Sequence, residues 1–139
     1  MKIFLDANVL VSVLNKEYPV YAYSSRILSL NQFAGYNLLS SPICLAIAFY
    51  FSEKKSGRAE AKRKIEILNK HIEFTTVNSK TVNDALKNKK INDLEDGLEY
   101  YSATESGCKY IITEDVKDFY FSELEVYNCR TFFERVIKK

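Results

Sequence analysis

Aspartate side chains follow two short apolar segments near opposite ends of the chain. Asp6 closes the segment Lys2–Leu5, and Asp115 follows the segment Lys109–Thr113, with Asp118 three residues later. If both segments are parallel strands, their carboxyl ends meet at one edge of a sheet, where such sheets form their ligand sites. We therefore expect these carboxylates to lie close together.

A further aspartate lies in a helical segment between these two regions. Asp96 is flanked by Leu94 and Leu98, in a segment that Asp93 or Asn92 caps. A single aspartate after a strand is often only a helix cap. Aspartate inside a helix is a poor helix former, however, and it is seldom buried without a partner. Asp96 is therefore the strongest candidate for a functional carboxylate.

Carboxylates that converge without cations repel one another and raise their pKa values. A hard divalent cation such as Mg²⁺ or Mn²⁺ removes that penalty and prefers oxygen ligands, and the pattern supplies no histidine or cysteine partner. Such a site polarises a phosphate and activates a water for attack on a phosphodiester. Asn8 and Thr113 are polar neighbours that we expect to orient the carboxylates. The chemistry expected here is metal-dependent phosphodiester hydrolysis.

Short apolar segments alternate with segments of helical periodicity, which predicts an α/β protein with a mainly parallel sheet and helices on both faces. The expected strands are Lys2–Leu5, Tyr36–Leu39, Ile72–Thr76, Lys109–Thr113 and Glu125–Tyr127. The expected helices are Asn8–Leu14, Tyr21–Phe33, Ile43–Phe51, Glu60–His71, Ser79–Leu86, Asp93–Glu105 and Thr131–Ile137. The segment Ile43–Phe51 is apolar all round, which predicts a buried helix.

The composition is that of a globular protein, with 139 residues, 47% hydrophobic and 27% charged. This length predicts one domain over residues 1–139. Without an apolar run of about 18 residues or a signal-peptide pattern, we expect no membrane span and a cytoplasmic location. Cys44, Cys108 and Cys129 are widely spaced among apolar residues, which predicts buried free thiols.

Two groups of side chains leave alternatives open. The basic residues are either solvated helix surface or a rim that holds phosphate around the acidic centre; they lie between Lys54 and Lys64 and, just before the central acidic segment, at Lys87, Lys89 and Lys90. The aromatic residues at the start of the chain are either core or a surface for a partner helix or a second copy; they are Tyr18, Tyr21, Tyr23 and Phe33. We expect the single histidine, His71, to be structural or solvent-facing.

Four segments together resemble the PIN-domain family, which includes the VapC toxin nucleases. Leu5–Leu10 is similar to the opening Asp-x-Asn motif, and Asp93–Ala103 to the central Glu-Asp-Ala helix. Ile111–Phe119 is similar to the Thr-Arg-Asn-x-x-Asp-Phe segment, and Ser122–Phe133 to the terminal strand and helix. The resemblance implies a three-layer α/β/α sandwich with a central, mainly parallel sheet. It also implies an acidic pocket that binds Mg²⁺ or Mn²⁺ and hydrolyses RNA.

By position, the resemblance makes Asp6, Asp96 and Asp115 the catalytic metal-site acids and Asp118 a fourth metal ligand or a cap. Glu99, three residues after Asp96, is the next candidate and would support these acids together with Asn8 and Thr113. The partners implied are an RNA substrate and, for a toxin, an antitoxin protein. A homodimer is a further expectation.

The sequence departs from the family pattern at two places. The helix after the second strand lacks its usual carboxylate, and Ile47 or Ala48 occupies that position. Glu114 stands where an arginine is common, and we expect it to add negative charge beside the pocket. The alternative function is therefore a catalytically degenerate PIN-like module that binds RNA or protein. A receiver domain also gathers aspartates at strand ends, but its later lysine-bearing strand is missing.

Overall fold

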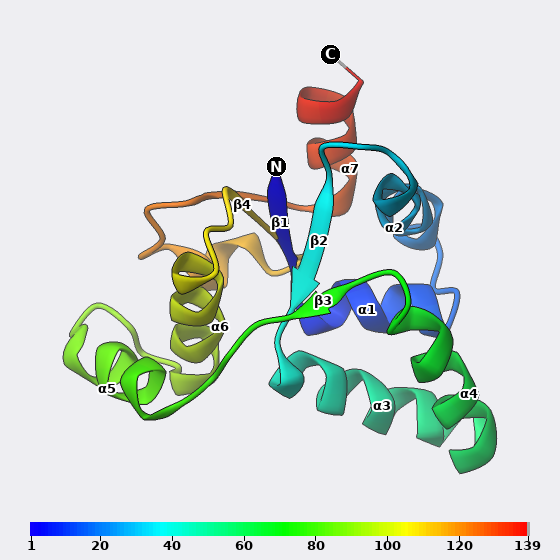
Figure 1. Cartoon of the computed structure of the whole chain (residues 1–139), viewed down its shortest axis with the longest axis horizontal. Coiled ribbons are helices and arrows are strands. Elements are labelled where there is room, and N and C mark those ends of the chain that lie inside the picture. Colours follow the sequence, from blue (N-terminus) through cyan, green and yellow to red (C-terminus); the bar gives the residue numbers. More distant parts are fainter. Residues whose placement is uncertain (139) are drawn as a thin grey trace.

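The computed structural model describes residues 1–138 and has a five-stranded parallel sheet at its centre (Figure 1). The strand order is β3-β2-β1-β4-β5. The strands are β1 (Lys2–Leu5), β2 (Asn37–Ser40), β3 (Glu73–Phe74), β4 (Tyr110–Ile112) and β5 (Glu125–Tyr127). The central strand β1 pairs with both β2 and β4, and its apolar side chains are buried on both faces of the sheet.

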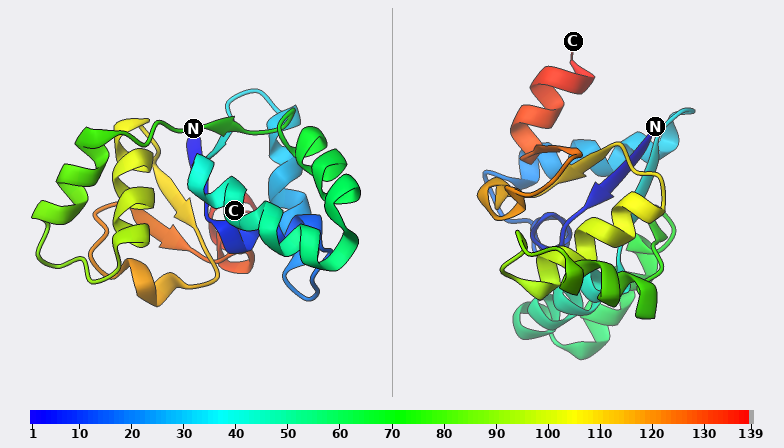
Figure 2. Two further views of the ribbon diagram at one scale, coloured as in Figure 1. Left: turned by 90° about the horizontal axis from the view of Figure 1, so that it is seen from below. Right: turned by 90° about the vertical axis from the view of Figure 1, so that its left-hand side faces the viewer.

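Helices cover both faces of this sheet and complete three layers. They are α1 (Ala7–Leu14), α2 (Tyr21–Leu28), α3 (Pro42–Ser56), α4 (Arg58–Leu68), α5 (Ser79–Lys87), α6 (Leu94–Glu105) and α7 (Cys129–Phe132). The contacts of α1 with α2 and α3, and of α3 with α4, join one group, while α5 packs on α6 in another. Figure 2 shows the two groups on different sides of the sheet. The predicted α/β/α sandwich is confirmed.

The predicted elements are present with small shifts at their ends. The segment Tyr21–Phe33 divides into α2 and a short 3₁₀ turn over Ser29–Gln32, and Val116–Phe119 forms a second such turn. The last helix begins two residues earlier than expected, because Asn128 caps it by accepting from the Thr131 amide at 2.8 Å. A wider π-type turn over Phe133–Ile137 extends it.

The prediction that Ile43–Phe51 forms a buried helix is wrong. Helix α3 runs on to Ser56, and its fully buried residues, Cys44, Ala48 and Ser52, lie four apart along one stripe. That stripe packs on α1 and α4, while Tyr50 is 52% and Phe51 45% exposed. The cause is that this stripe faces α1 and α4, whereas Tyr50 and Phe51 lie outside it, although apolar side chains surround the axis of the helix.

The aromatic residues at the start of the chain divide between the two alternatives. Tyr18 and Phe33 are 72% and 59% exposed, so a core role is wrong for both. Tyr23 packs against the core, and half-buried Tyr21 meets the Tyr18 ring edge-on at 5.3 Å. The three cysteines are free and buried, as predicted. Among the described helices, none is long and apolar enough to cross a membrane.

Candidate metal centre

The ends of β1 and β4 bring the first carboxylates together. Leu5 lies opposite Ile112 in the sheet, so the next residues, Asp6 and Thr113, are neighbours. The Thr113 hydroxyl donates to Asp6 Oδ2 at 2.8 Å, and the Ala7 amide donates to Asp6 Oδ1 at 2.8 Å. Asp6 therefore caps α1 with one oxygen while β4 holds the other, and its carboxylate has a defined orientation.

Thr113 and Asn8 link this carboxylate to Asp115. The Thr113 hydroxyl oxygen accepts from Asn8 Nδ2 and from the Asp115 amide, both at 3.1 Å. Asn8 Nδ2 also lies 3.2 Å from Asp115 Oδ2, and Asn8 Oδ1 accepts from the Glu114 amide at 3.1 Å. These two uncharged side chains thus hold α1 against the segment after β4 and leave the outer Asp115 oxygen free of them.

The N-terminus of α6 brings in Asp96. Asp93 caps this helix by accepting from the Glu95 amide at 2.9 Å and the Asp96 amide at 3.4 Å. Asp96 consequently lies in the first turn of α6 and not deep in the helix, and it is half-buried. Gly97 lets α6 approach α5 closely, because a Cβ at this position would lie 3.0 Å from the Ala85 Cβ.

Burial and mutual repulsion dominate the electrostatics of these acids. Burial, followed by the charges of Asp93 and Asp6, raises the pKa of Asp96 to about 7. Burial also raises the pKa of Asp6, although the Thr113 and Ala7 hydrogen bonds oppose the shift. The pKa of Glu95 is raised for the same reasons, burial first and Asp93 next. At neutral pH and without a bound cation, these acids are therefore harder to ionise than ordinary carboxylates.

The acids open onto a hollow of about 440 Å³. Its carboxylates are Asp6, Glu17, Asp93, Glu95, Asp96, Asp115 and Asp118, and Asn8 joins them. Of the described residues, no lysine or arginine lines it. Asp118 is exposed here and follows Asp115 by one short turn. A set of oxygen donors with unbalanced negative charge fits a hard divalent cation.

Glu99 lies behind these acids and not in the hollow. It is 1% exposed, and Ser41 Oγ donates to its Oε1 at 2.6 Å while the Cys44 thiol donates to its Oε2. Cys44 Sγ also lies 3.6 Å from Asp6 Oδ1, so that oxygen and sulfur atoms of Asp6, Cys44 and Glu99 fall within 4.8 Å of one another. Burial is the main reason that the pKa of Glu99 is about 7.

The sequence pattern alone did not identify Cys44 and Ser41 as neighbours of the acids, and the expectation of no cysteine partner is wrong. Both residues begin α3, directly after β2, and β2 pairs with β1. The available signal was their place beyond the carboxyl end of a predicted strand. Reading that signal required knowing which strand neighbours β1.

Ile47, and not Ala48, occupies the position on α3 where the family usually has a carboxylate facing the site. Ile47 lines the acidic hollow together with Phe51, one turn further along α3, whereas Ala48 is fully buried. Glu53 does not compensate, because it pairs with Arg58 at 2.9 Å.

Glu114 does not add charge to the hollow, and that expectation is wrong. Its carboxylate accepts from the Cys129 amide at 2.9 Å, at the start of α7. The orphan amides of a helix N-terminus attract a carboxylate, which explains the direction of this side chain. The charge that replaces the family's arginine therefore stabilises the C-terminal helix.

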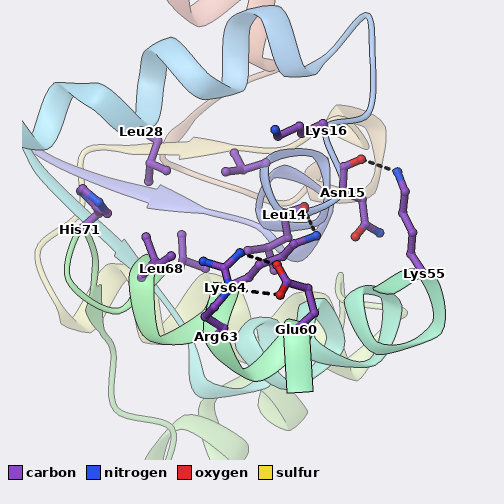
Figure 3. Close-up of a pocket in the computed structure, with 12 residues that line it drawn as sticks. Leu14, Asn15, Lys16, Leu28, Lys55, Glu60, Arg63, Lys64, Leu68 and His71 are labelled. Carbon is purple, nitrogen blue, oxygen red and sulfur yellow. Dashed lines mark hydrogen bonds and ion pairs between the residues drawn. The ribbon is translucent and has the colours of Figure 1, made fainter. Parts of the chain in front are cut away.

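Three basic residues of the middle segment, Lys55, Arg63 and Lys64, lie around another hollow, of about 530 Å³ (Figure 3). Leu14, Leu28 and Leu68 line its apolar part. Lys55 donates to the Asn15 carbonyl at 2.5 Å, and Lys64 to the Leu14 carbonyl at 3.1 Å. These lysines hold α3 and α4 against the end of α1, which does not support a phosphate-holding rim at the acids. His71 lines the same hollow, and its Nδ1 lies 3.0 Å from Asn31 Nδ2, which agrees with a structural role.

Comparison with known proteins agrees with the arrangement of the strands. A family model for the PIN domain matches residues 2–117. Ribonuclease VapC1 of Aquifex aeolicus (strain VF5) is 32% identical over 144 residues, covering 96% of this chain and 94% of that protein.

Solved structures share the fold at lower identity. VapBC2 from Rickettsia felis, bound to a promoter DNA fragment, superposes with a TM-score of 0.71 at 20% identity, covering 92% of this chain and 98% of that one. VapBC-1 from nontypeable Haemophilus influenzae gives 0.69 at 18% identity, covering 94% and 99%. Because the PIN-domain family model matches most of the sequence and a VapC ribonuclease is 32% identical, this chain belongs to the PIN-domain family.

Proposed function

We propose that this protein is a Mg²⁺- or Mn²⁺-dependent endoribonuclease of the VapC type, which hydrolyses RNA phosphodiesters. The observation that carries the proposal is the convergence of Asp6, Asp96 and Asp115 on one hollow lined by seven carboxylates and no described lysine or arginine. Burial and repulsion raise the pKa of Asp96 to about 7, which is the environment that a divalent cation relieves. The identity to a protein named a ribonuclease supports RNA as the substrate.

Asp6, Asp96 and Asp115 would hold the ion, with Asp118 at the exposed side of the hollow. When bound, the ion would neutralise charge on the phosphate and activate the attacking water. Thr113 and Asn8 keep Asp6 and Asp115 in fixed orientations through the hydrogen bonds described above. Glu99 supports Asp6 from behind, through the Cys44 thiol that contacts both carboxylates.

A toxin role with an antitoxin partner is part of the proposal. Two of the structures that share this fold are of VapBC assemblies, from Rickettsia felis and Haemophilus influenzae. A homodimer is also proposed, since Tyr18 and Phe33 expose aromatic surface outside the acidic hollow.

One observation favours a second function, a PIN-like module that binds RNA or protein without turnover. Ile47 faces the hollow where the family usually has an acid, so the protein offers one metal ligand fewer. The two functions differ in metal affinity. Calorimetric titration with Mn²⁺ should give saturable binding for the nuclease, whereas absence of binding would favour the module.

Cleavage of a mixed pool of structured RNA tests the proposed function. We expect the wild type to cut RNA with Mn²⁺ or Mg²⁺ and to stop when EDTA is added. Asp96→Asn should remove activity, because it replaces one of the three converging acids, while the folded state persists. Asp84→Asn is the matched control: Asp84 is on α5, paired with Lys80 at 3.0 Å and not part of the hollow. Equal cutting by the Asp96→Asn variant would contradict the proposal.

A further inference from the structure

The acidic hollow has an uncharged wall that the proposed chemistry does not use. Ile47 and Phe51, one turn apart on α3, form this wall with Ala7 and Val11 of α1. The hollow therefore combines carboxylates that would hold a phosphate through a cation with a hydrocarbon surface next to them.

Phe51 is the distinctive member of this wall. Its side chain remains 45% exposed although it lines the hollow, so the fold does not bury it. Its neighbour Tyr50 is 52% exposed and meets the Phe51 ring edge-on at 5.3 Å, and Lys54 lies 5.1 Å from the Tyr50 ring. Phe51 thus offers an aromatic surface in the hollow, whereas the more exposed Tyr50 ring does not line it.

A nucleobase is the occupant that fits both parts of the hollow. In RNA the base is joined to its phosphate through a single sugar, so a phosphodiester held at Asp6, Asp96 and Asp115 brings an adjoining base into the same hollow. Aromatic side chains bind bases by stacking, with little dependence on base identity. A base inside a duplex is already stacked and paired, and RNA recognition of this kind uses unpaired loops and ends.

We propose that Phe51, supported by Ile47, forms a base-stacking subsite for the nucleotide next to the scissile phosphate. This inference rests on the proposed function and deepens it. Ile47, at the position where the family usually has an acid, would then contact the base, whereas a carboxylate there would repel the RNA backbone.

The test measures binding separately from cleavage. The probe is a single-stranded ten-nucleotide RNA that carries one 2-aminopurine, a base whose fluorescence falls on stacking, with Ca²⁺ in place of Mg²⁺ to suppress hydrolysis. Phe51→Ala should weaken binding about tenfold and abolish the fluorescence loss. Phe51→Tyr keeps a ring and should restore both. Leu86→Ala is the control, because Leu86 is 65% exposed on α5 and does not line the hollow, and this variant should bind as the wild type does.

A second arm uses an RNA hairpin whose cut site lies in the loop, with the base next to the cut removed. Loss of the base should raise KM for the wild type about tenfold and leave kcat unchanged, since stacking is present before and during the reaction. The same change should have no further effect in the Phe51→Ala variant, because the two changes remove one interaction.

Two results would overturn the subsite: wild-type RNA affinity in Phe51→Ala, or equal losses of affinity in Leu86→Ala and Phe51→Ala. Wild-type affinity together with a changed oligomeric state of Phe51→Ala would assign Phe51 to a contact between copies of the chain. Cleavage that Asp96→Asn abolishes but Phe51→Ala leaves unchanged would refute this inference without contradicting the proposed nuclease function. Base stacking on Phe51 without any cleavage would support the subsite and contradict only the nuclease.

Discussion

Replacing Glu99 by glutamine should change how the stability of the protein depends on pH. Glu99 is 1% exposed, and burial holds its pKa at about 7 against an ordinary 4.5. In the unfolded chain the group therefore loses its proton near pH 4.5, while in the folded protein it keeps it until about pH 7. Between these values unfolding releases a proton, so the free energy of unfolding falls as the pH rises.

The magnitude follows from the two pKa values, about 7 and 4.5. Each unit of difference corresponds to about 1.4 kcal/mol, so Glu99 should cost the wild type about 3 kcal/mol between about pH 4 and pH 8. Glu99→Gln keeps a side-chain oxygen to accept from Ser41 or Cys44 but cannot ionise. The difference in the free energy of unfolding between variant and wild type should therefore shift by about 3 kcal/mol in favour of the variant as the pH rises through this range.

Urea unfolding in the presence of EDTA, at several pH values, measures this difference without a contribution from bound metal. Asp6 and Asp96 titrate in both proteins, so their contributions to the pH dependence of the free energy of unfolding largely cancel when the variant is compared with the wild type. Glu66→Gln is the control, because Glu66 is exposed on α4 and should show no such trend. A constant difference between Glu99→Gln and the wild type across the range would refute the assignment of Glu99 as a buried, neutral acid.

Three further changes test other parts of the site. Mn²⁺ affinity should fall by up to about tenfold per pH unit below about pH 7, because a proton then occupies Asp96. Calorimetry at pH 6 and pH 8 should show this fall, and equal affinities at the two pH values would contradict it. Thr113→Val should lower the free energy of unfolding by about 2 kcal/mol and Mn²⁺ affinity at least tenfold, since Asp6 loses its donor, whereas Thr113→Ser should behave as the wild type. Glu114→Ala should cost about 1 kcal/mol by freeing the Cys129 amide and should not change RNA cleavage; a loss of cleavage at constant stability would place Glu114 in the site after all.

The strand-end acids were predictable because of a general property of parallel sheets. Asp6 and Asp115 each follow an apolar strand, and strands of one direction end at one edge, so their approach required only that β1 and β4 be neighbours. The start of α6 was predictable for a similar reason, since Asp93 is a strong cap ahead of helical periodicity.

The directions of individual side chains were not predictable in this way. Cys44 lies beside Asp6 because β2 pairs with β1, and strand order is a long-range property that local patterns do not contain. Phe51 lies off the buried stripe of α3 and is 45% exposed, although the apolar pattern of the helix has no polar face to indicate it. Glu114 turns to the amide of Cys129, fifteen residues further along the chain.

The most direct test of the metal-dependent ribonuclease measures cleavage rate and Mn²⁺ binding together, in the same buffer, over a series of Mn²⁺ concentrations. Both curves should share one midpoint for the wild type, and Asp96→Asn should lose binding and cleavage together. RNA cleavage that persists in EDTA, or that proceeds at a wild-type rate in a variant that no longer binds Mn²⁺, would contradict the proposed metal dependence.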